Sequence, residues 1–209
     1  MSHMRRSFVA AAITLLASPL AAQTSPVPMA SRAKGSAQAP VTVYEMSDFQ
    51  CPYCRRFALE TFPLLDSLYV ATGKVRWVFI NFPLTSLHPN AVPAAGIALC
   101  AAKQGAFWAI HDLLYKHQED WAHLEDPSEY LLSLTDSAEV SRPQLIECLK
   151  APTTAEEVRA DAEGASRSGA ASTPTFYIEG GLLVGAQPAA VFRHLLDSIY
   201  VEKQVRPGR

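Results

Sequence analysis

Residues 51–54 read Cys-Pro-Tyr-Cys, and two thiols at this spacing narrow the possible chemistry. They can exchange disulfides, form a structural bridge, supply half of a zinc site or be two unrelated buried side chains. A strand-prone run, Val41-Thr-Val-Tyr-Glu-Met, precedes them, and an amphipathic helical stretch begins at Arg55. A thiol in the first turn of a helix lies near unpaired N–H groups and the positive end of the helix dipole, which favour its thiolate. We therefore predict a redox pair in which Cys51 is the nucleophile.

The other two residues of the motif fit the same chemistry. One helical turn brings Cys54 back toward Cys51, so Cys54 is the expected resolving thiol. Pro52 suits the first helical position because that position needs no N–H donor and the fixed φ of proline starts a helix abruptly. A purely structural bridge does not require a strand before it and a helix after it. Redox chemistry is therefore favoured.

Zinc is a weaker interpretation of the motif. A zinc site takes about four ligands, and the remaining cysteines, Cys100 and Cys148, stand alone and far apart. The histidines show neither HxxxH nor HExxH spacing, so scattered helix and loop histidines are favoured; they include His88, His111, His117 and His123. We expect no metal and no cofactor.

The composition indicates a single soluble domain. The chain has 209 residues, of which 49% are hydrophobic, and a formal net charge of -2. This length allows a sizeable core. Lysine and arginine total 18 against 20 aspartate and glutamate residues, so no basic excess points to nucleic acid. A monomer is the default expectation.

The first 22 residues have the pattern of a secretory signal peptide, with two arginines, an apolar run from Phe8 and a small-residue end. A buried helix or a membrane anchor is the alternative, but the run is shorter than the roughly 20 residues that span a bilayer. The choice between the general and the twin-arginine export route stays open. Residues 23–39 are rich in Ser, Ala, Pro and Gln and predict a flexible linker.

The remaining chain predicts one α/β domain over residues 40–202, with a C-terminal tail over 203–209. The N-terminal part of the domain is predicted to form a β-α-β unit with parallel strands and a right-handed connection. The C-terminal part is predicted to form a β-β-α unit whose hairpin contains Gly180-Gly181. Helical periodicity fills the stretch between them, which predicts a helical insertion. The expected segments are strands at 41–46 and 75–81, a helix from Pro52 to about Ala71, the insertion at about 90–169, strands on either side of Gly180-Gly181, and a helix from about Pro188 to Val201.

Several motifs resemble those of the DsbA-like family of exported thiol–disulfide oxidoreductases in the thioredoxin superfamily. They are Asp48-Phe-Gln-Cys-Pro-Tyr-Cys, Phe82-Pro-Leu with His88-Pro-Asn, Ala98-Leu-Cys-Ala with Phe107-Trp, and Ser172-Thr-Pro-Thr-Phe. A CxxC alone is moderately specific, whereas a CxxC after a strand together with a distant Thr-Pro-Thr-Phe is strong. The resemblance covers about residues 40–202 and implies a thioredoxin fold with a helical insertion.

The resemblance also implies roles for residues outside the CxxC motif. The Thr173–Pro174 bond should be cis and lie against the cysteine pair, where the Thr173 backbone would meet an extended substrate; the sequence alone favours an ordinary trans proline opening a strand. Glu45, six residues before Cys51, matches a buried carboxylate that handles the proton of Cys54. The alternatives are a solvent-facing strand glutamate and a rival carboxylate, Asp48.

Tyr53 departs from the best-known oxidant of the family, which has histidine between the cysteines. Tyrosine brings a weaker, neutral hydrogen-bond donor, so the strength of the oxidant stays open. For Cys100 and Cys148, an even number of cysteines in an exported chain predicts a second, structural disulfide. Two buried, unpaired cysteines are the alternative.

Together these features predict a periplasmic or otherwise extracytoplasmic oxidase that donates its Cys51–Cys54 disulfide to reduced or misoxidised exported proteins. By resemblance, its partner would be a membrane quinone-linked oxidase of the DsbB type. Two alternatives are a disulfide isomerase and a reductase fed by a membrane thiol carrier. An alternative of another class is a chaperone module that binds unfolded polypeptide.

Overall fold

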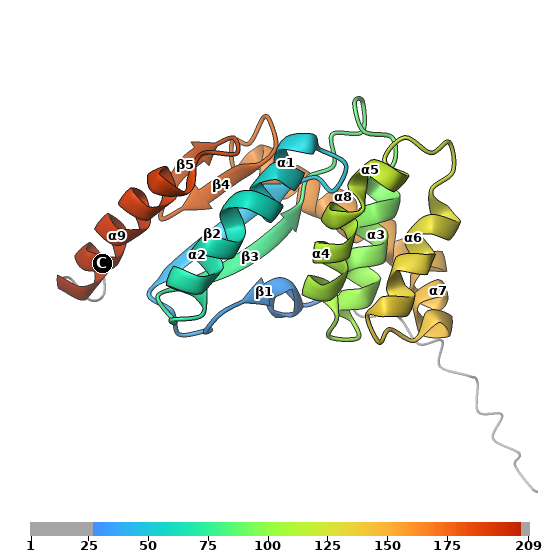
Figure 1. Ribbon diagram of the computed structural model, residues 1–209, viewed down its shortest axis with the longest axis horizontal. Coiled ribbons are helices and arrows are strands. Elements are labelled where there is room, and N and C mark those ends of the chain that lie inside the picture. Colours follow the sequence, from blue (N-terminus) through green and yellow to red (C-terminus); the bar gives the residue numbers. More distant parts are fainter. Residues whose placement is uncertain (1–26, 206–209) are drawn as a thin grey trace, which may run out of the picture.

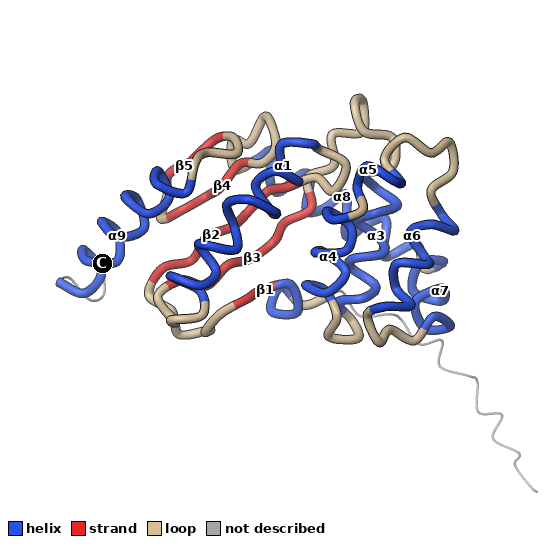
Figure 2. Tube along the Cα trace, viewed as in Figure 1, coloured by secondary structure: helices blue, strands red, loops and turns tan. Residues whose placement is uncertain are grey.

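The computed structural model describes residues 27–205, which are built around a five-stranded sheet (Figures 1 and 2). The strand order is β1-β3-β2-β4-β5, and β2 and β3 are parallel while the other neighbours are antiparallel. The strands are β1 (Ala33–Lys34), β2 (Val41–Ser47), β3 (Val75–Asn81), β4 (Thr175–Ile178) and β5 (Gly181–Val184). The sequence-based prediction of an α/β thioredoxin fold is confirmed.

The connection between β2 and β3 is one helical segment that contains the CxxC motif. It comprises α1 (Pro52–Arg56), a π-helical stretch (Phe57–Thr61), α2 (Phe62–Leu65) and a second π-helical stretch (Asp66–Val70). Pro63 lies within this segment and has no N–H to donate, which accounts for a break in the regular α-helical hydrogen bonding before it. The predicted helix from Pro52 to about Ala71 is therefore present, but its turns are not uniform.

The hairpin turn between β4 and β5 lies one residue earlier than the glycine pair suggested. Ile178 pairs with Gly181, so the two turn residues are Glu179 and Gly180, with φ of 46° and 88°. A two-residue turn with positive φ at both positions matches the twist of the flanking strands. Gly181 is consequently the first residue of β5, and Glu179 adopts the left-handed conformation.

The helical insertion lies between β3 and β4 and packs at one end of the sheet (Figure 1). Nearly every residue of α3 is buried because the other insertion helices surround it. The last helix of the molecule, α9 (Ala189–Val205), packs against α2 and β2. The insertion helices are α3 (Ala91–Ala102), α4 (Phe107–Lys116), α5 (Gln118–Trp121), α6 (Ser128–Leu134), α7 (Arg142–Lys150) and α8 (Pro152–Arg167).

Both faces of the sheet are covered by apolar side chains. On one face the CxxC helical segment and α9 enclose an aromatic cluster that includes Phe57, Trp77 and Phe176. On the opposite face Met46 and Ile80 pack with Ala165 of α8. Successive side chains of β2 point to opposite faces of the sheet and therefore belong to two different apolar clusters.

The segment before residue 40 differs from the predicted linker. From Val27 onward the chain is ordered: a short 3-10 helix (Met29–Arg32) precedes β1, which pairs with the edge of β3. Arg32 forms a buried ion pair with Asp161 of α8. The prediction of a flexible linker over residues 23–39 is wrong for this part, because strand pairing and a buried ion pair fix a segment whose composition is typical of linkers.

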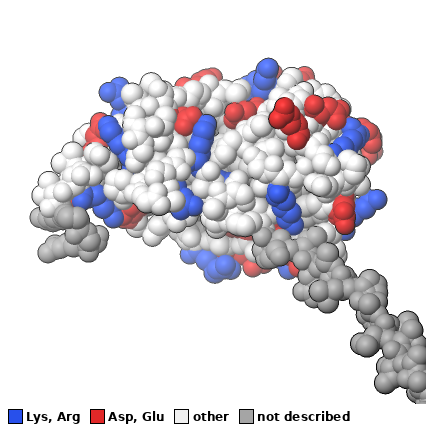
Figure 3. Space-filling model, turned by 90° about the horizontal axis from the view of Figure 1, so that it is seen from below, with Lys and Arg blue, Asp and Glu red and all other residues white. Residues whose placement is uncertain are grey.

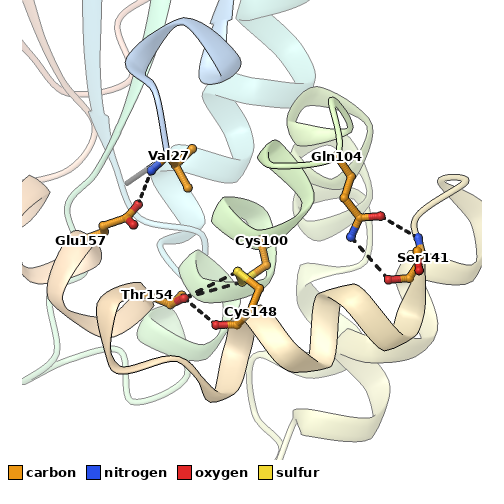
Figure 4. The surroundings of a disulfide bond; sticks show 7 residues. All are labelled: Val27, Cys100, Gln104, Ser141, Cys148, Thr154 and Glu157. Atoms are coloured by element: carbon orange, nitrogen blue, oxygen red, sulfur yellow. Dashed lines mark hydrogen bonds between the residues drawn. A yellow bond between two sulfur atoms is a disulfide. The ribbon is translucent and has the colours of Figure 1, made fainter. Parts of the chain in front are cut away.

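The second cysteine pair forms a disulfide within the insertion, as Figure 4 shows. Cys100 of α3 and Cys148 of α7 have Cα atoms 5.7 Å apart. The Thr154 hydroxyl donates a hydrogen bond of 2.7 Å to the Cys148 carbonyl oxygen at the start of α8. The predicted structural disulfide is confirmed, and the alternative of two unpaired cysteines is wrong.

Charged side chains are dispersed on the face shown in Figure 3, where both signs occur side by side. Over residues 27–205, none of the helices combines the length and apolar character needed to cross a bilayer. The predicted signal peptide (residues 1–22) lies outside the described residues, as does most of the predicted tail, from residue 206 onward.

Candidate active site

Cys51 lies at the junction between the loop that follows β2 and the first turn of α1. It is the N-terminal capping residue of α1 with φ of -73° and ψ of 124°, and Pro52 occupies the first turn. The Cys51 N–H donates to the Asp48 carbonyl oxygen at 3.1 Å, and the Arg55 N–H donates to the Cys51 carbonyl oxygen at 3.1 Å. The motif therefore has the strand–helix context that the sequence predicted, and both of its thiols are free.

The two thiols of the motif have opposite acidities. A hydrogen bond from the Cys54 thiol, assisted by the backbone N–H groups of Cys54 and Tyr53, lowers the pKa of Cys51 to about 6 although burial acts against it. Burial raises the pKa of Cys54 well above its ordinary value, and its hydrogen bond to the Cys51 sulfur raises it further. Cys51 is thus a thiolate at neutral pH, whereas Cys54 retains its proton.

The Thr173–Pro174 peptide bond is cis, as the family resemblance implied. It lies against the cysteine pair, because the Cys51 sulfur is 3.5 Å from the Thr173 carbonyl oxygen. These residues are 122 positions apart in the chain. The fold therefore places an irregular backbone segment beside the reactive sulfur, where main-chain groups can bind an extended polypeptide.

Glu45 of β2 is buried, with an exposed fraction of 1%. Its Oε2 accepts a hydrogen bond of 2.8 Å from the Trp77 indole N–H. Desolvation raises the pKa of Glu45, although a charge interaction with His111 and the Trp77 hydrogen bond oppose the increase. The alternative of a solvent-facing glutamate is wrong. A carboxyl whose pKa is raised by burial in this way keeps its proton to a higher pH than an exposed glutamate does.

Asp48 serves a structural purpose in the loop before the motif. Its Oδ1 accepts from the Gln50 N–H at 2.7 Å, and its Oδ2 lies 2.8 Å from the Leu84 N–H and 2.7 Å from His88 Nδ1. Both carboxylate oxygens are therefore engaged by the loops that hold Cys51 in place. These contacts give Asp48 a role in holding the loop.

Two polar side chains near Cys54 were not singled out from the sequence. The hydroxyls of Ser47 and Tyr115 lie 3.1 Å apart, and Tyr115 also donates to the Asp48 carbonyl oxygen at 3.3 Å. The Ser47 hydroxyl opposes part of the increase in the pKa of Cys54. Period-two alternation along β2 could have found Ser47, which follows Glu45 on the same face. No sequence signal connects Tyr115 with β2.

Amide side chains attach the insertion to the motif. Gln118 of α5 donates to the carbonyl oxygens of Phe49 and Cys51 at 2.6 and 3.1 Å. Gln50 donates to the Ala122 carbonyl oxygen at 2.7 Å. The insertion therefore positions the loop on which the nucleophile sits, although these glutamines look like ordinary helix and loop residues in the sequence.

The Tyr53 side chain points outward with an exposed fraction of 59%, and the Arg56 guanidinium lies 5.3 Å from its ring centre. The contribution of Tyr53 to the Cys51 thiolate therefore comes from its backbone N–H rather than from its phenol. Arg55 turns toward the insertion, where it donates to the Tyr115 carbonyl oxygen at 3.1 Å and pairs with Glu119 at 3.2 Å.

A surface hollow of about 570 Å³ opens beside Pro52, between the start of α1, the loop after β3 and α5. It is bordered by exposed Leu87 and by charged or polar side chains, including Arg55 and Glu119. Within residues 27–205, no group of three or more His, Cys, Asp or Glu side chains could hold a metal ion. The geometry is that of a dithiol site beside a surface hollow.

Comparison with known proteins agrees with this geometry. A family model described as thioredoxin matches residues 29–198. The probable disulfide bond formation protein D of Bacillus anthracis is 32% identical over 154 residues, which cover 71% of this chain and 69% of that protein. The Na(+)/H(+) antiporter NhaA 3 of Salinispora tropica is 34% identical over 174 residues, or 83% of this chain. The chain spans only 25% of the length of that antiporter.

The fold also resembles that of solved structures. The crystal structure of Wolbachia pipientis alpha-DsbA1 superposes with a TM-score of 0.75 at 21% sequence identity. The match covers 83% of this chain and 92% of that one. At this identity the likeness concerns the fold, including the placement of a helical insertion beside a thioredoxin sheet.

Proposed function

The chain belongs to the DsbA-like thiol–disulfide oxidoreductases of the thioredoxin family, and from this membership we propose that it acts as an oxidase. It would donate the Cys51–Cys54 disulfide to exported proteins. The observation that carries the proposal is the difference between the two thiols, since the pKa of Cys51 is lowered to about 6 while that of buried Cys54 is raised. A stabilised thiolate favours the reduced enzyme and makes its disulfide a better oxidant.

The reaction consists of two exchanges in which electrons pass from substrate to enzyme. A substrate thiolate attacks the Cys51 sulfur, the Cys51–Cys54 bond breaks, and Cys54 leaves as a thiolate that takes a proton from Glu45. A second substrate thiolate then attacks the substrate sulfur of the mixed disulfide. The substrate leaves with its own disulfide, and Cys51 is released as a thiolate.

The remaining site residues have supporting roles in this proposal. The backbone of Thr173, held by the cis bond to Pro174, would pair with the extended substrate beside Cys51. Pro52 starts α1 so that the nucleophile occupies the capping position. Tyr53 contributes its backbone N–H to the thiolate and an exposed ring to the surface near the substrate.

The cellular setting follows from the chemistry and stays part of the proposal. Donation of disulfides requires an oxidising compartment, so the site of action would be the periplasm or another extracytoplasmic space, after removal of residues 1–22. The reduced enzyme needs an electron acceptor, for which a membrane quinone-linked oxidase of the DsbB type is the candidate partner. We propose that the chain works as a monomer.

The reduction potential of the Cys51–Cys54 couple, measured in glutathione buffers, tests the direction of the reaction. We expect a value well above the roughly -270 mV of thioredoxin, together with rapid oxidation of a reduced, unfolded protein substrate. A potential near that of thioredoxin, with a near-ordinary pKa for Cys51, would instead assign the enzyme to the reductases. Faster rearrangement of a scrambled disulfide protein than oxidation of a reduced one would favour an isomerase.

A further inference from the structure

The proposed reaction requires a proton to reach Glu45 while the active site is covered. Cys54 and Glu45 have exposed fractions of 0% and 1%. In the proposed reaction a bound polypeptide would lie over Cys51 and Thr173 and form a covered groove with them. Water therefore has little access to Glu45 from the groove during the exchange, and a second way for the proton to enter or leave would have to pass through the protein.

His111 of α4 is a buried titratable group that the exchange steps do not use. Its exposed fraction is 1%, and within residues 27–205 its Nε2 has no hydrogen-bond partner. Oε1 of Glu45 is likewise buried and has no partner at hydrogen-bond distance within the described chain, although the neighbouring Ser47 hydroxyl acts to lower the pKa of the carboxyl. Unsatisfied buried polar atoms are costly, so two of them on groups that interact through their charges point to a function.

The side chains around His111 connect it with the strand pair that carries Glu45. Phe79 lies directly opposite Glu45 in the register of β2 and β3, and its ring centre is 5.4 Å from that of His111. Tyr115, one helical turn later on α4, has its ring centre 4.9 Å from that of His111. The histidine thus lies in an aromatic enclosure on the same face of the sheet as Glu45.

The other nitrogen of His111 contacts a side chain that reaches the surface. Its Nδ1 lies 2.8 Å from Oδ1 of Asp112, whose side chain is 70% exposed. Asp112 borders a surface hollow of about 330 Å³, together with Lys34, Asp66 and Lys116. This hollow is distinct from the one beside Pro52. The imidazole therefore has one nitrogen without a partner in the interior and one in contact with an exposed carboxylate.

We propose that His111 is a positioning residue that relays protons between Glu45 and solvent, with Asp112 at the outer end of the route. The inference deepens the proposed function, since it rests on Glu45 being the proton carrier for Cys54. Imidazole suits a relay because one ring nitrogen can accept a proton while the other releases one. The route would work while a polypeptide covers the groove.

In each reduction of the enzyme the proposed route carries one proton from solvent to Cys54. When the Cys51–Cys54 bond breaks, Cys54 leaves as a thiolate and takes the proton of the Glu45 carboxyl. The Glu45 carboxylate then receives a proton from Nε2 of His111, directly or through a water, and Nδ1 recovers one from solvent at Asp112. No electrons move in these steps. In the reverse exchange, the proton of Cys54 leaves by the same route.

The titratable groups that face this route come from several elements. Cys54 of α1 and Tyr115 of α4 lie at the inner end, and Lys34, Asp66 and Lys116 surround the outer opening. The pKa of Glu45 is raised mainly by burial, while the charge interaction with His111 is the largest opposing effect. Tyr115 keeps its proton because burial raises its pKa well above the ordinary value.

The test compares five variants of the full chain in stopped-flow exchange with a protein thiol substrate and with dithiothreitol, in both redox directions. His111→Phe keeps the enclosure apolar and filled, and Asp112→Asn changes an exposed side chain that does not endanger folding. Asp120→Asn is the matched control, since Asp120 pairs with exposed His117 at 3.1 Å. Glu45→Gln, alone and combined with His111→Phe, completes the set.

We expect Glu45→Gln to slow exchange about tenfold with both substrates. His111→Phe should slow the protein substrate about fivefold to tenfold and dithiothreitol less than about twofold, because the small thiol leaves the groove open to water. Asp112→Asn should also slow the protein substrate more than dithiothreitol, but by a smaller factor, and should shift the pH–rate profile. Asp120→Asn should leave both rates unchanged. The double variant should lose no more than Glu45→Gln alone, as expected for groups on one route.

Three results would overturn the relay separately from the role of Glu45. Equal slowing of both substrates by His111→Phe, or additive losses in the double variant, would mean that His111 only supports packing. An unchanged rate for His111→Phe alongside a slow Glu45→Gln would leave Glu45 in place and remove the relay. An unchanged rate for Glu45→Gln would overturn the proton role of Glu45, and the relay with it. Because exchange is measured in both directions, a failed oxidase assignment gives a different result from all of these.

Discussion

Cys51 and Cys54 lie within one turn at a strand–helix junction, whereas Cys100 and Cys148 are 48 residues apart and join two helices of the insertion. All four side chains are buried. The first pair is surrounded by polar groups, among them the Ser47 hydroxyl, the Asp48 N–H and the carbonyl oxygen of Thr173. The second pair lies in the apolar core of the insertion with the Thr154 hydroxyl as its polar neighbour.

The comparison shows that burial alone does not make a cysteine pair structural. Hydrogen-bond donors directed at one sulfur lower the pKa of Cys51, and desolvation of the other raises the pKa of Cys54, which separates a nucleophile from a resolving thiol. The second pair, in contrast, forms a disulfide that links α3 to α7. The polar environment therefore decides which disulfide takes part in exchange.

The largest expected effect comes from removing the nucleophile. Cys51→Ser should reduce the rate of disulfide exchange with a protein substrate by more than about a thousandfold, because a hydroxyl is a far weaker nucleophile than a thiolate at neutral pH. Stopped-flow fluorescence measures the rate. Cys54→Ser, mixed with a substrate that carries a disulfide, should instead accumulate a mixed disulfide, because the Cys51 thiolate displaces one substrate thiolate and no resolving thiol follows; mass spectrometry detects the product. Full exchange activity of Cys51→Ser would favour a chaperone module over an enzyme.

The matching change in the other pair should affect stability and not exchange. Replacing Cys100 and Cys148 by alanine should lower the free energy of unfolding by about 2–4 kcal/mol, because the disulfide closes a long loop in the unfolded chain. Urea unfolding, with Cys51 and Cys54 kept reduced, measures the difference. The contrast between the pairs would break down if the double variant exchanged disulfides much more slowly than the unaltered protein.

The acidity of Cys51 predicts how alkylation depends on pH. With a pKa of about 6, the rate of Cys51 alkylation should be nearly constant above pH 7 and fall about tenfold per pH unit well below 6. Because the folded pKa is below the unfolded value of 9.0, the thiolate stabilises the reduced fold above pH 9, and this contribution fades as the pH falls through 6. If the alkylation rate of Cys51 instead reached half of its maximum near pH 9, the two motif thiols would not differ in acidity in the way proposed.

A smaller effect should follow from loosening the contact between insertion and motif. Gln118→Ala removes the hydrogen bonds to the carbonyl oxygens of Phe49 and Cys51, and should lower both the unfolding free energy by about 1–2 kcal/mol and the exchange rate severalfold. Gln104→Ala is the control, because its amide bonds Ser141 near the structural disulfide. Gln104→Ala should lower the unfolding free energy but leave the exchange rate unchanged. Equal exchange rates for Gln118→Ala and Gln104→Ala would contradict a positioning role for Gln118.

Local sequence was sufficient for the parts of the site that lie close together in the chain. Proline after Cys51, between a strand-prone run and a helical run, predicts the capping position that the structure has. Alternation along β2 was already sufficient to put Glu45 and Ser47 on one face, although only Glu45 was singled out. The linker composition of residues 23–39 was misleading, because pairing with β3 depends on an edge that forms only when the sheet does.

By itself, then, the sequence determined the CxxC chemistry, the order of strands and helices from Val41 onward, and the family, but not β1. Only the tertiary structure decided which residues meet the two sulfurs: Thr173 reaches Cys51 from 122 positions away, and Tyr115 reaches Ser47 from 68. The physical reason is that periodicity encodes which face of an element is buried but not which partner covers it. The pKa values of Cys51, Cys54 and Glu45 follow from that covering, since desolvation and hydrogen bonding exist only in the packed molecule.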